Sequence, residues 1–369
     1  MYQKERKLNP VLLIVLAAAL LAVGAVMKMT VSILFAALLI WLSATQLNVK
    51  TETAVVTRGD NSTAAFAPGD EVSILSWNIG YAGLGEESDF FMDGGGGSVA
   101  ESPEVVREDI LGSAEALRAL SPDFVLFQEV DIDGTRSHHI DEYELLRTQF
   151  PSDWSVFCQN YDSAFLAWPL YAPHGANRAG LATFSRLPVS DPVRKSLPIS
   201  DSFSKFLDLD RCYSIVRVPA GDAELVLFNV HLSAYGADAS IMAAQREKLY
   251  EDMTAERAAG NYVIAGGDFN QTFPGGLDKY PIKNDDLWTP GMLDDSMLPD
   301  GWHFAYDTSV PTCRLDNQPY DAESEATQHY VIDGFILSPN VELTSVQTQD
   351  DGFRFSDHNP VLLEVTLLQ

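Results

Sequence analysis

The sequence predicts a layered α/β fold that follows an N-terminal membrane anchor. A long apolar segment fills most of residues 1–45, and the patterns of a strand, a helix and a second strand then follow one another between residues 72 and 127. Strands that alternate with helices in this way pack as sheets covered by helical layers. Hydrophobic residues make up 46% of the 369-residue chain, and we find no internal repeat in residues 71–369. We therefore expect one large globular domain there.

The anchor is predicted from two apolar runs. Residues 11–27 are uncharged and number 17, enough for a helix of about 25 Å, which is near the lower limit for crossing a bilayer. A second run, residues 31–44, follows Lys28. Basic residues precede the first run, which favours a cytoplasmic N-terminus. We expect an uncleaved, single-pass anchor in the cell membrane with the rest of the chain outside the cytoplasm; a hairpin of two short spans, which would leave the domain inside, stays open.

Residues 46–70 mix Thr, Asn, Ser, Ala, Gly and Asp without any period. Such a composition is typical of a linker, so we expect this segment to hold the domain away from the membrane.

Charge and cysteine content narrow the function classes. The formal net charge is −28, which disfavours avid non-specific binding to nucleic acid, although a nuclease that works through bound cations is still compatible with it. The three cysteines, Cys158, Cys212 and Cys313, lack metal-ligand spacing, and their odd number excludes complete disulfide pairing.

The first elements of the domain have clear signals. Residues 72–77 alternate between apolar and polar as a half-buried strand does. Ser102 followed by Pro103 predicts the start of a helix, and the apolar strand 124–127 lacks alternation, as expected for a strand covered on both faces. The four glycines at 94–97 predict a flexible loop that does not cradle phosphate, because no Lys-Ser/Thr follows them.

The rest of the domain is richer in strands. A helix is predicted over about 240–259, with Gly260 as its stop. The further predicted strands are 154–157, 180–184, 212–218, 225–230, 262–265, 330–337 and 361–365.

Polar side chains that suit phosphate chemistry lie at or just beyond the ends of six predicted strands. They are Asn78, Glu129, His231, Asp268, Asn270, Asp333, Asp357 and His358. Each alone is explained by a turn, a solvated carboxylate or a buried histidine with its hydrogen bonds satisfied. Six strands that end in this way indicate a shared site.

The residue types indicate metal-assisted phosphoryl chemistry. Carboxylate and amide oxygens are hard ligands that suit Mg²⁺ or Mn²⁺. A carboxylate beside an amide can orient and deprotonate a water, and a histidine can bind phosphoryl oxygens when a second acid fixes its tautomer. The nucleophile-elbow motif of serine hydrolases and the glycine fingerprint of dinucleotide binding are both absent from the sequence.

The same stretches resemble the endonuclease/exonuclease/phosphatase superfamily, which includes deoxyribonucleases, abasic-site endonucleases and neutral sphingomyelinases. The similarity covers about residues 70–369, and the catalytic part most resembles membrane-anchored bacterial members. The matching stretches are Ser76-Trp77-Asn78, Phe127-Gln128-Glu129, Asn229-Val230-His231-Leu232, Gly267-Asp268-Phe269-Asn270, Ile332-Asp333 and Ser356-Asp357-His358-Asn359-Pro360-Val361. The resemblance implies a four-layered α/β sandwich of two packed mixed sheets flanked by helices, with residues 71–369 as the catalytic domain.

The resemblance also implies roles for these residues. Asn78, Glu129 and Asp357 would hold the metal. Asp268 would activate the attacking water, and Asn270 and His231 would contact the scissile phosphate. His358, oriented by Asp333, would neutralise the phosphate oxygens.

Substrate-binding residues are less defined. Family nucleases often carry Arg and Tyr in the middle loops, and Tyr161, Arg178 and Arg211 are the candidates here. The expected partners are a phosphate-ester substrate and the membrane, and no protein partner is predicted.

Three functions compete. The first is a metal-dependent phosphodiesterase or phosphomonoesterase at a membrane surface, and the second is a tethered or secreted nuclease acting on DNA or RNA. The third is a catalytically inactive binding scaffold, which the complete set of acid, amide and imidazole side chains argues against.

Overall fold

The computed structural model describes residues 10–46, 54–59, 65–163, 165–199, 210–234, 239–284 and 286–369. The chain divides into two compact units, Met1–Asn48 and Val49–Gln369.

The first unit contains one long helix, α1 (Pro10–Gln46, 37 residues). Within it, Ala19–Leu38 has a mean hydropathy of 2.0 and is long and apolar enough to cross a membrane. The helix continues without interruption through Lys28, where the sequence had suggested a break between two apolar runs. The Thr30 hydroxyl donates to the Val26 carbonyl one turn earlier (2.9 Å), which satisfies its polar group inside the helix. The alternative of two short spans requires a turn between them, and the described residues 10–46 contain none.

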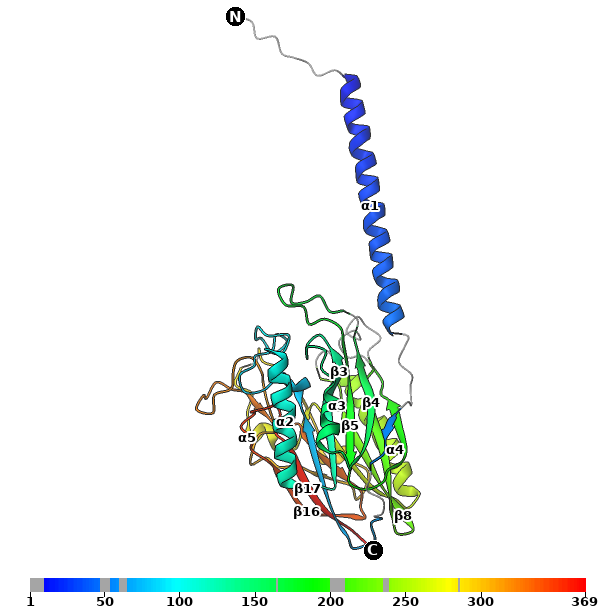
Figure 1. The fold of residues 1–369 in the computed structure, drawn as a ribbon, viewed down its shortest axis with the longest axis vertical. Helices are drawn as coiled ribbons and strands as arrows, with labels where there is room; N and C mark the ends of the chain where they lie inside the picture. Colours follow the sequence, from blue (N-terminus) through cyan, green and yellow to red (C-terminus); the bar gives the residue numbers. More distant parts are fainter. Residues whose placement is uncertain are drawn as a thin grey trace, which may run out of the picture. The chain divides into compact units, whose positions relative to one another are not determined.

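The second unit is built on two mixed sheets (Figure 1). The seven-stranded sheet has the order β1 (Val55–Thr57), β4 (Trp154–Asp162), β5 (Asn177–Ser185), β3 (Phe124–Gly134), β2 (Glu71–Asn78), β17 (Val361–Leu367), β16 (Val341–Thr348). The six-stranded sheet has the order β12 (His303–Ala305), β15 (Asp333–Leu337), β9 (Tyr262–Asp268), β8 (Ala223–His231), β7 (Cys212–Ala220), β6 (Ser190–Ser196). Two short pairs complete the strands: β10 (Gln271–Thr272) with β11 (Gly291–Met292), and β13 (Cys313–Arg314) with β14 (His329–Tyr330).

The longer helices cover the outer faces of the sheets: α2 (Pro103–Leu120) and α3 (Glu142–Gln149) lie on the seven-stranded sheet, and α4 (Ala239–Ala258) lies on the six-stranded one. The described residues also contain the short helix α5 (Gly276–Lys279) and the 3-10 turns η1 (Gly80–Ala82) and η3 (Asp295–Met297). The Ser102 side chain caps α2 by accepting from the Val105 amide (3.2 Å), as the sequence predicted.

The hydrophobic core confirms the predicted four layers. Phe124 and Leu126 of β3 face the second sheet, whereas Val125 and Phe127 pack under α2 and α3. This explains why that strand is apolar at every position. On the other side, α4 packs on the outer face of the six-stranded sheet.

Buried polar side chains also connect the two sheets. The Gln128 side chain donates to Asn229 Oδ1 (2.8 Å), and the Asn229 amide donates to the carbonyls of Phe127 (3.1 Å) and Ala182 (3.2 Å). This Gln128–Asn229 bridge lies next to the strand ends that carry the predicted site residues, so it holds the two halves of that site in register.

Three local predictions need correction. Part of the predicted linker is strand β1, because the β-branched pair Val55 and Val56 pairs with β4. The predicted strand 330–337 is two strands in different sheets, β14 and β15, because Tyr330 pairs with Cys313 whereas Asp333 pairs with Asp268. The glycines at 94–97 lie in a turn held by Asp89, whose carboxylate accepts from the amides of Gly96 and Gly97 (2.9 Å each).

Candidate active site

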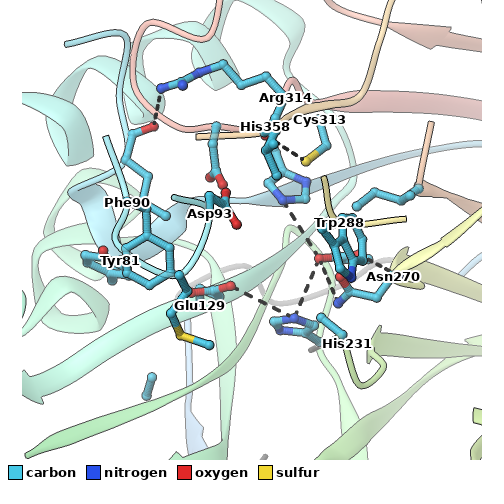
Figure 2. Close-up of a pocket in the computed structure, with 18 of the residues that line it drawn as sticks. Tyr81, Phe90, Asp93, Glu129, His231, Asn270, Trp288, Cys313, Arg314 and His358 are labelled. Carbon is cyan, nitrogen blue, oxygen red and sulfur yellow. Dashed lines mark hydrogen bonds and ion pairs between the residues drawn. The ribbon is translucent and has the colours of Figure 1, made fainter. Parts of the chain in front are cut away.

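A cavity of about 130 Å³ lies at the ends of the two sheets (Figure 2). Its lining includes six of the eight polar residues predicted at strand ends: Glu129, His231, Asp268, Asn270, Asp357 and His358. The other two, Asn78 and Asp333, lie directly behind this wall and hydrogen-bond to its members. The structure thus brings together all eight residues from segments spread over 280 positions of the chain, from position 78 to position 358.

Asp268 is at the centre of this arrangement. Its Oδ1 accepts from the Asn270 backbone amide (2.8 Å), and its Oδ2 accepts from Asn78 Nδ2 (3.0 Å). His231 Nε2 is 3.6 Å from Asp268 Oδ2. Strand register explains the proximity, because His231 of β8 and Asp333 of β15 both pair with Asp268 of β9.

Close backbone packing explains the glycine before Asp268. Gly267 has a φ of +150°, and a Cβ at this position would lie 1.9 Å from the Val230 carbonyl oxygen. Only glycine allows this approach without moving the neighbouring strand. Asn270 also has a positive φ (51°), which asparagine tolerates better than most residues.

The environment of Asp268 favours a proton acceptor near neutral pH. Burial and then the negative charge of Asp333 raise its pKa, while His358 and the two hydrogen-bond donors lower it, with a result of about 7. A group with this pKa can accept a proton from water and release it again at physiological pH.

The two histidines have opposite tendencies. Burial alone would lower the pKa of His358, because it opposes the charged imidazole. Negative neighbours outweigh this effect and raise the pKa well above its usual range. Asp333 contributes most among them, and its Oδ2 lies 2.9 Å from His358 Nδ1. Burial, followed by the positive Arg211, lowers the pKa of His231 well below its usual range. The pocket therefore combines a cationic imidazole with a neutral one.

His358 is held firmly from several sides. Trp77 Nε1 donates to the His358 carbonyl (2.9 Å), and the Ser356 hydroxyl accepts from the His358 amide (3.2 Å). The same hydroxyl donates to the Asn78 carbonyl (2.8 Å), so the C-terminal motif is tied to the end of β2.

A local bulge explains the placement of Glu129. The pairing of β3 with β5 shifts between Phe127 and Val130, and Glu129 has a φ of +56°. Bulges redirect side chains next to functional sites, and here the bulge points Glu129 into the cavity. Glu129 Oε1 accepts from Asn78 Nδ2 (3.3 Å) and is 4.0 Å from His231 Nε2.

The oxygen donors fit a hard divalent cation. Asp357 is buried, and burial raises its pKa to about 8; His358 lowers it, whereas Asp316 and Glu129 raise it further. Acids that repel one another in a buried site are stabilised by protons or by a cation. Asn78, Glu129 and Asp357 supply carboxylate and amide oxygens, the ligands Mg²⁺ and Mn²⁺ prefer.

Two further groups of metal-competent side chains share His358. Asp268, Asp333 and His358 form one, and Cys313, Asp357 and His358 form the other, with the ligand atoms of each group within 4.8 Å of one another. In the first group, the short Nδ1–Oδ2 contact indicates a hydrogen-bonded pair that orients the imidazole rather than a metal cage.

Among the lining residues that sequence reasoning did not single out are Tyr81, Arg136 and Arg314. Arg136 stacks over the Tyr81 ring (4.0 Å from its centroid), bonds Asp131 (2.8 Å) and lies 3.6 Å from Glu129 Oε2. Arg314 is buried, pairs with Asp316 (2.6 Å) and donates to the Gly85 carbonyl (2.7 Å). These residues lie in irregular segments or very short strands, where no strand-end pattern marks them.

The predicted substrate-binding residues separate into two groups. Tyr161 and Arg211 line the cavity. Arg178 is exposed on β5 between the buried Asn177 and Ala179, and it pairs with Asp133 (2.7 Å). Strand alternation turns its side chain away from the cavity.

An acidic groove of about 1000 Å³ adjoins the cavity and shares Tyr81 and Leu84 with it. Its charged lining contains eight acids and one base: Glu86, Glu87, Asp89, Glu101, Glu108, Asp109, Glu115, Asp351 and Arg354. We refer to this surface as the acidic groove.

Comparison with known proteins identifies the family to which this chain belongs. The sequence model of the endonuclease/exonuclease/phosphatase family matches residues 75–358, a range that contains all eight predicted strand-end residues. No curated protein matches the chain significantly.

Solved structures share the fold at low sequence identity. An endonuclease/exonuclease/phosphatase from Beutenbergia cavernae is 17% identical over 81% of this chain and 72% of its own, with a TM-score of 0.55. TDP2 of D. rerio, complexed with a single-stranded DNA product, is 14% identical over 80% of this chain and 99% of its own, with a TM-score of 0.51. A family protein from Leptotrichia buccalis is 14% identical over 80% of this chain and 100% of its own, with a TM-score of 0.50.

Proposed function

This chain belongs to the endonuclease/exonuclease/phosphatase family, and from that premise we propose that it is a divalent-metal-dependent phosphoesterase in which water attacks the phosphorus directly. The observation that carries this proposal is the convergence of Asp268 and His358 on one cavity, with Asn78 from a third distant segment bonded to Asp268 behind its wall. No serine or cysteine nucleophile is required by this arrangement.

The side chains divide the work by charge and protonation. Asp268 accepts a proton from the attacking water, and its two hydrogen bonds from Asn270 and Asn78 fix the direction of its lone pairs. The cationic His358 neutralises charge that develops on the phosphate oxygens, and Asp333, bonded to Nδ1, orients the ring and stabilises its positive charge. His231 and Asn270 position the phosphate from the opposite wall.

A divalent cation held by Asn78, Glu129 and Asp357 would supply charge neutralisation for the phosphate and the leaving oxygen. Arg136 supports this group from behind, because its contact with Glu129 limits where the carboxylate can move.

A small or lipid phosphate ester is the substrate class that we favour. The acidic groove adjoins the cavity and repels the flanking phosphates of a polynucleotide. The chain's net charge of −28 acts in the same direction. Hydrolysis of DNA or RNA is the alternative function, and a substrate panel separates the two.

We also propose that residues 1–45 anchor the enzyme in the cell membrane as a single span and that the catalytic domain faces away from the cytoplasm. The unbroken length of α1 and the basic residues before it support this topology. A reporter enzyme that is active only outside the cytoplasm, fused after Gln369, should be active; an inactive fusion would reverse the orientation.

The direct test uses the full chain in detergent. We expect it to hydrolyse an activated phosphodiester with Mg²⁺ or Mn²⁺, to stop with a chelator and to recover when the ion is restored. Plasmid DNA, RNA, sphingomyelin, phosphoinositides and nucleotides then form the substrate panel. A rate that is unchanged by chelator would refute the metal assignment.

A further inference from the structure

The loop between β4 and β5 carries an exposed apolar tip. Phe165, Trp168, Leu170 and Tyr171 are 47%, 65%, 77% and 75% exposed. Residues 163–177 contain no charged side chain, although 21% of the chain is charged. Scattered exposed hydrophobic residues are ordinary, but four within seven positions indicate a contact surface. We call residues 165–171 the apolar tip.

The base of this loop is held in a defined position. Leu166 and Gly175 exchange two backbone hydrogen bonds (2.8 and 3.0 Å), which makes the loop a hairpin. Gly175 packs so closely on Thr135 that an added Cβ would lie 2.2 Å from Thr135 Cβ. The Tyr171 hydroxyl donates to the Gly96 carbonyl (2.6 Å). The exposure of the tip is therefore built into the fold.

The hairpin is continuous with the wall of the catalytic cavity. His174, on its returning arm, lines the cavity and donates through Nδ1 to the Ser98 carbonyl (2.7 Å). Its ring lies 6.0 Å from Phe90 and 6.3 Å from Tyr81, which also line the cavity. A contact that fixes the position of the apolar tip therefore also fixes the side of the cavity that His174 lines.

Strand register places the start of β1 at the same end of the sheet as the hairpin. β1 is antiparallel to β4, with Val55 opposite Phe157 and Thr57 opposite Ser155. β1 therefore starts beside the end of β4 that leads into the hairpin.

From these observations we propose that the apolar tip inserts into the interfacial layer of the membrane and presents the catalytic cavity to a phosphate ester carried by a membrane lipid. This inference rests on the proposed function and names its substrate class. Trp and Tyr with neighbouring Leu and Phe are the residues that favour the membrane–water interface, where an apolar body and a polar end are both accommodated.

The first experiment measures insertion without using activity. The full chain is reconstituted in phosphatidylcholine nanodiscs with a nitroxide at Leu170→Cys, and a matched label is placed at Leu343→Cys on β16, at the opposite edge of the same sheet. The three native cysteines are buried, and the unsubstituted protein serves as the labelling blank. We expect the label at 170 to be severalfold more accessible to oxygen, and less accessible to a water-soluble nickel chelate, than the label at 343. Equal accessibility to the nickel chelate at both positions would overturn the proposal.

The second experiment measures what insertion does for turnover. The same reacting group is offered as diacylglycerophospho-p-nitrophenol in the bilayer and as glycerophospho-p-nitrophenol in water, with Mg²⁺. In both, the water oxygen bonds to phosphorus, the bond to the aryl oxygen breaks, p-nitrophenolate leaves and the proton of the water passes to Asp268.

We expect the double variant Trp168→Ser, Leu170→Ser to lose about tenfold in kcat/KM on the lipid and to keep its rate on the soluble ester. The conservative pair Trp168→Phe, Leu170→Met should retain lipid turnover, and Leu343→Ser should behave as the unsubstituted protein. An equal loss on both esters would assign the tip a merely structural role and overturn the proposal. If the unsubstituted protein cleaves neither ester, the proposed function fails, and the spin-label result still decides insertion.

Discussion

The hairpin that bears the apolar tip and the acidic groove both adjoin the catalytic cavity, and their chemistry is opposite. The hairpin that bears the tip lacks charged residues, whereas the groove has eight acids against one arginine. The glycine turn separates them, since Gly96 accepts from Tyr171 of the tip while Gly97 lines the groove. The contrast shows that the net charge of −28 is not spread evenly around the substrate path. One side of the mouth favours an apolar phase, and the other side favours water and repels anions.

The largest expected effect is on kcat, and it distinguishes a residue of the cavity from a residue of the acidic groove. Asp268→Ala should reduce kcat by roughly a thousandfold or more, because it removes the proton acceptor and leaves Asn78 and Asn270 without their shared partner. Glu115→Gln in the acidic groove should change kcat less than about twofold. Steady-state kinetics on a soluble phosphodiester compares them, with circular dichroism to check folding. A comparable loss in both variants would mean that the groove takes part in the chemistry.

The next effect tests whether the acidic groove excludes polyanions. Replacing Glu86, Glu108 and Glu115 by Lys changes the local charge by six units, since each substitution replaces −1 by +1. We expect turnover of single-stranded DNA, relative to a soluble phosphodiester, to rise by about tenfold at low ionic strength and to fall back with added salt. If the ratio does not move with charge or salt, groove repulsion is not what selects against nucleic acid.

A smaller effect concerns stability. Asp109 in the groove is buried, and its Oδ2 has no hydrogen-bond partner among the described residues. Burial and then Glu108 and Glu86 raise its pKa to about 8. In the unfolded chain this carboxyl titrates near pH 4, so between about pH 4 and pH 8 the folded state binds more protons and becomes less stable as pH rises.

Asp109→Asn should remove this dependence and stabilise the protein by on the order of 1–3 kcal/mol at pH 8, with little gain at pH 4. Thermal unfolding of the full chain in detergent across this range measures it, and Glu115→Gln, exposed on the same helix, is the control. A gain of equal size at both pH values would point to a cause other than the titration of Asp109.

The smallest effect is expected beside the hairpin. Arg178 and Asp133 form an exposed pair at 2.7 Å, and such pairs contribute about 0–1 kcal/mol. Arg178→Ala should leave both stability and kcat/KM nearly unchanged, whereas Arg136→Ala should reduce kcat/KM because Glu129 loses its neighbour. Steady-state kinetics of the two variants side by side measures this difference. A larger loss of kcat/KM in Arg178→Ala than in Arg136→Ala would contradict the prediction.

Site residues can be predicted from the sequence where a local strand pattern marks them, and not where tertiary contacts place them. The polar residues at strand ends could be located because an apolar strand pattern ends just before most of them, as at Asn78, or begins just after them, as at His358. The direction in which Glu129 points could not, since it depends on a bulge that forms only when β3 pairs with β5. Arg136 carries no pattern, because its role arises from stacking on Tyr81.

Strand limits failed where tertiary pairing decides them. Residues 330–337 form one apolar run with a single acid, yet Tyr330 and Phe335 belong to different sheets. The sequence does not predict the strand β16 (Val341–Thr348), because only its two end residues are buried and its stability comes from pairing with β17 along nearly its whole length.

The Gln128–Asn229 bridge has a consequence for how this protein loses activity. Glu129 and Asp357 belong to or directly flank strands of one sheet, whereas His231 and Asp268 end strands of the other. Under the proposed mechanism, neither half alone can bind a phosphate and deliver a proton to or from it. Sliding of one sheet over the other by a single residue would separate the halves while leaving much secondary structure in place, so inactivation on heating should coincide with loss of the inter-sheet contacts and precede the melting of the strands themselves.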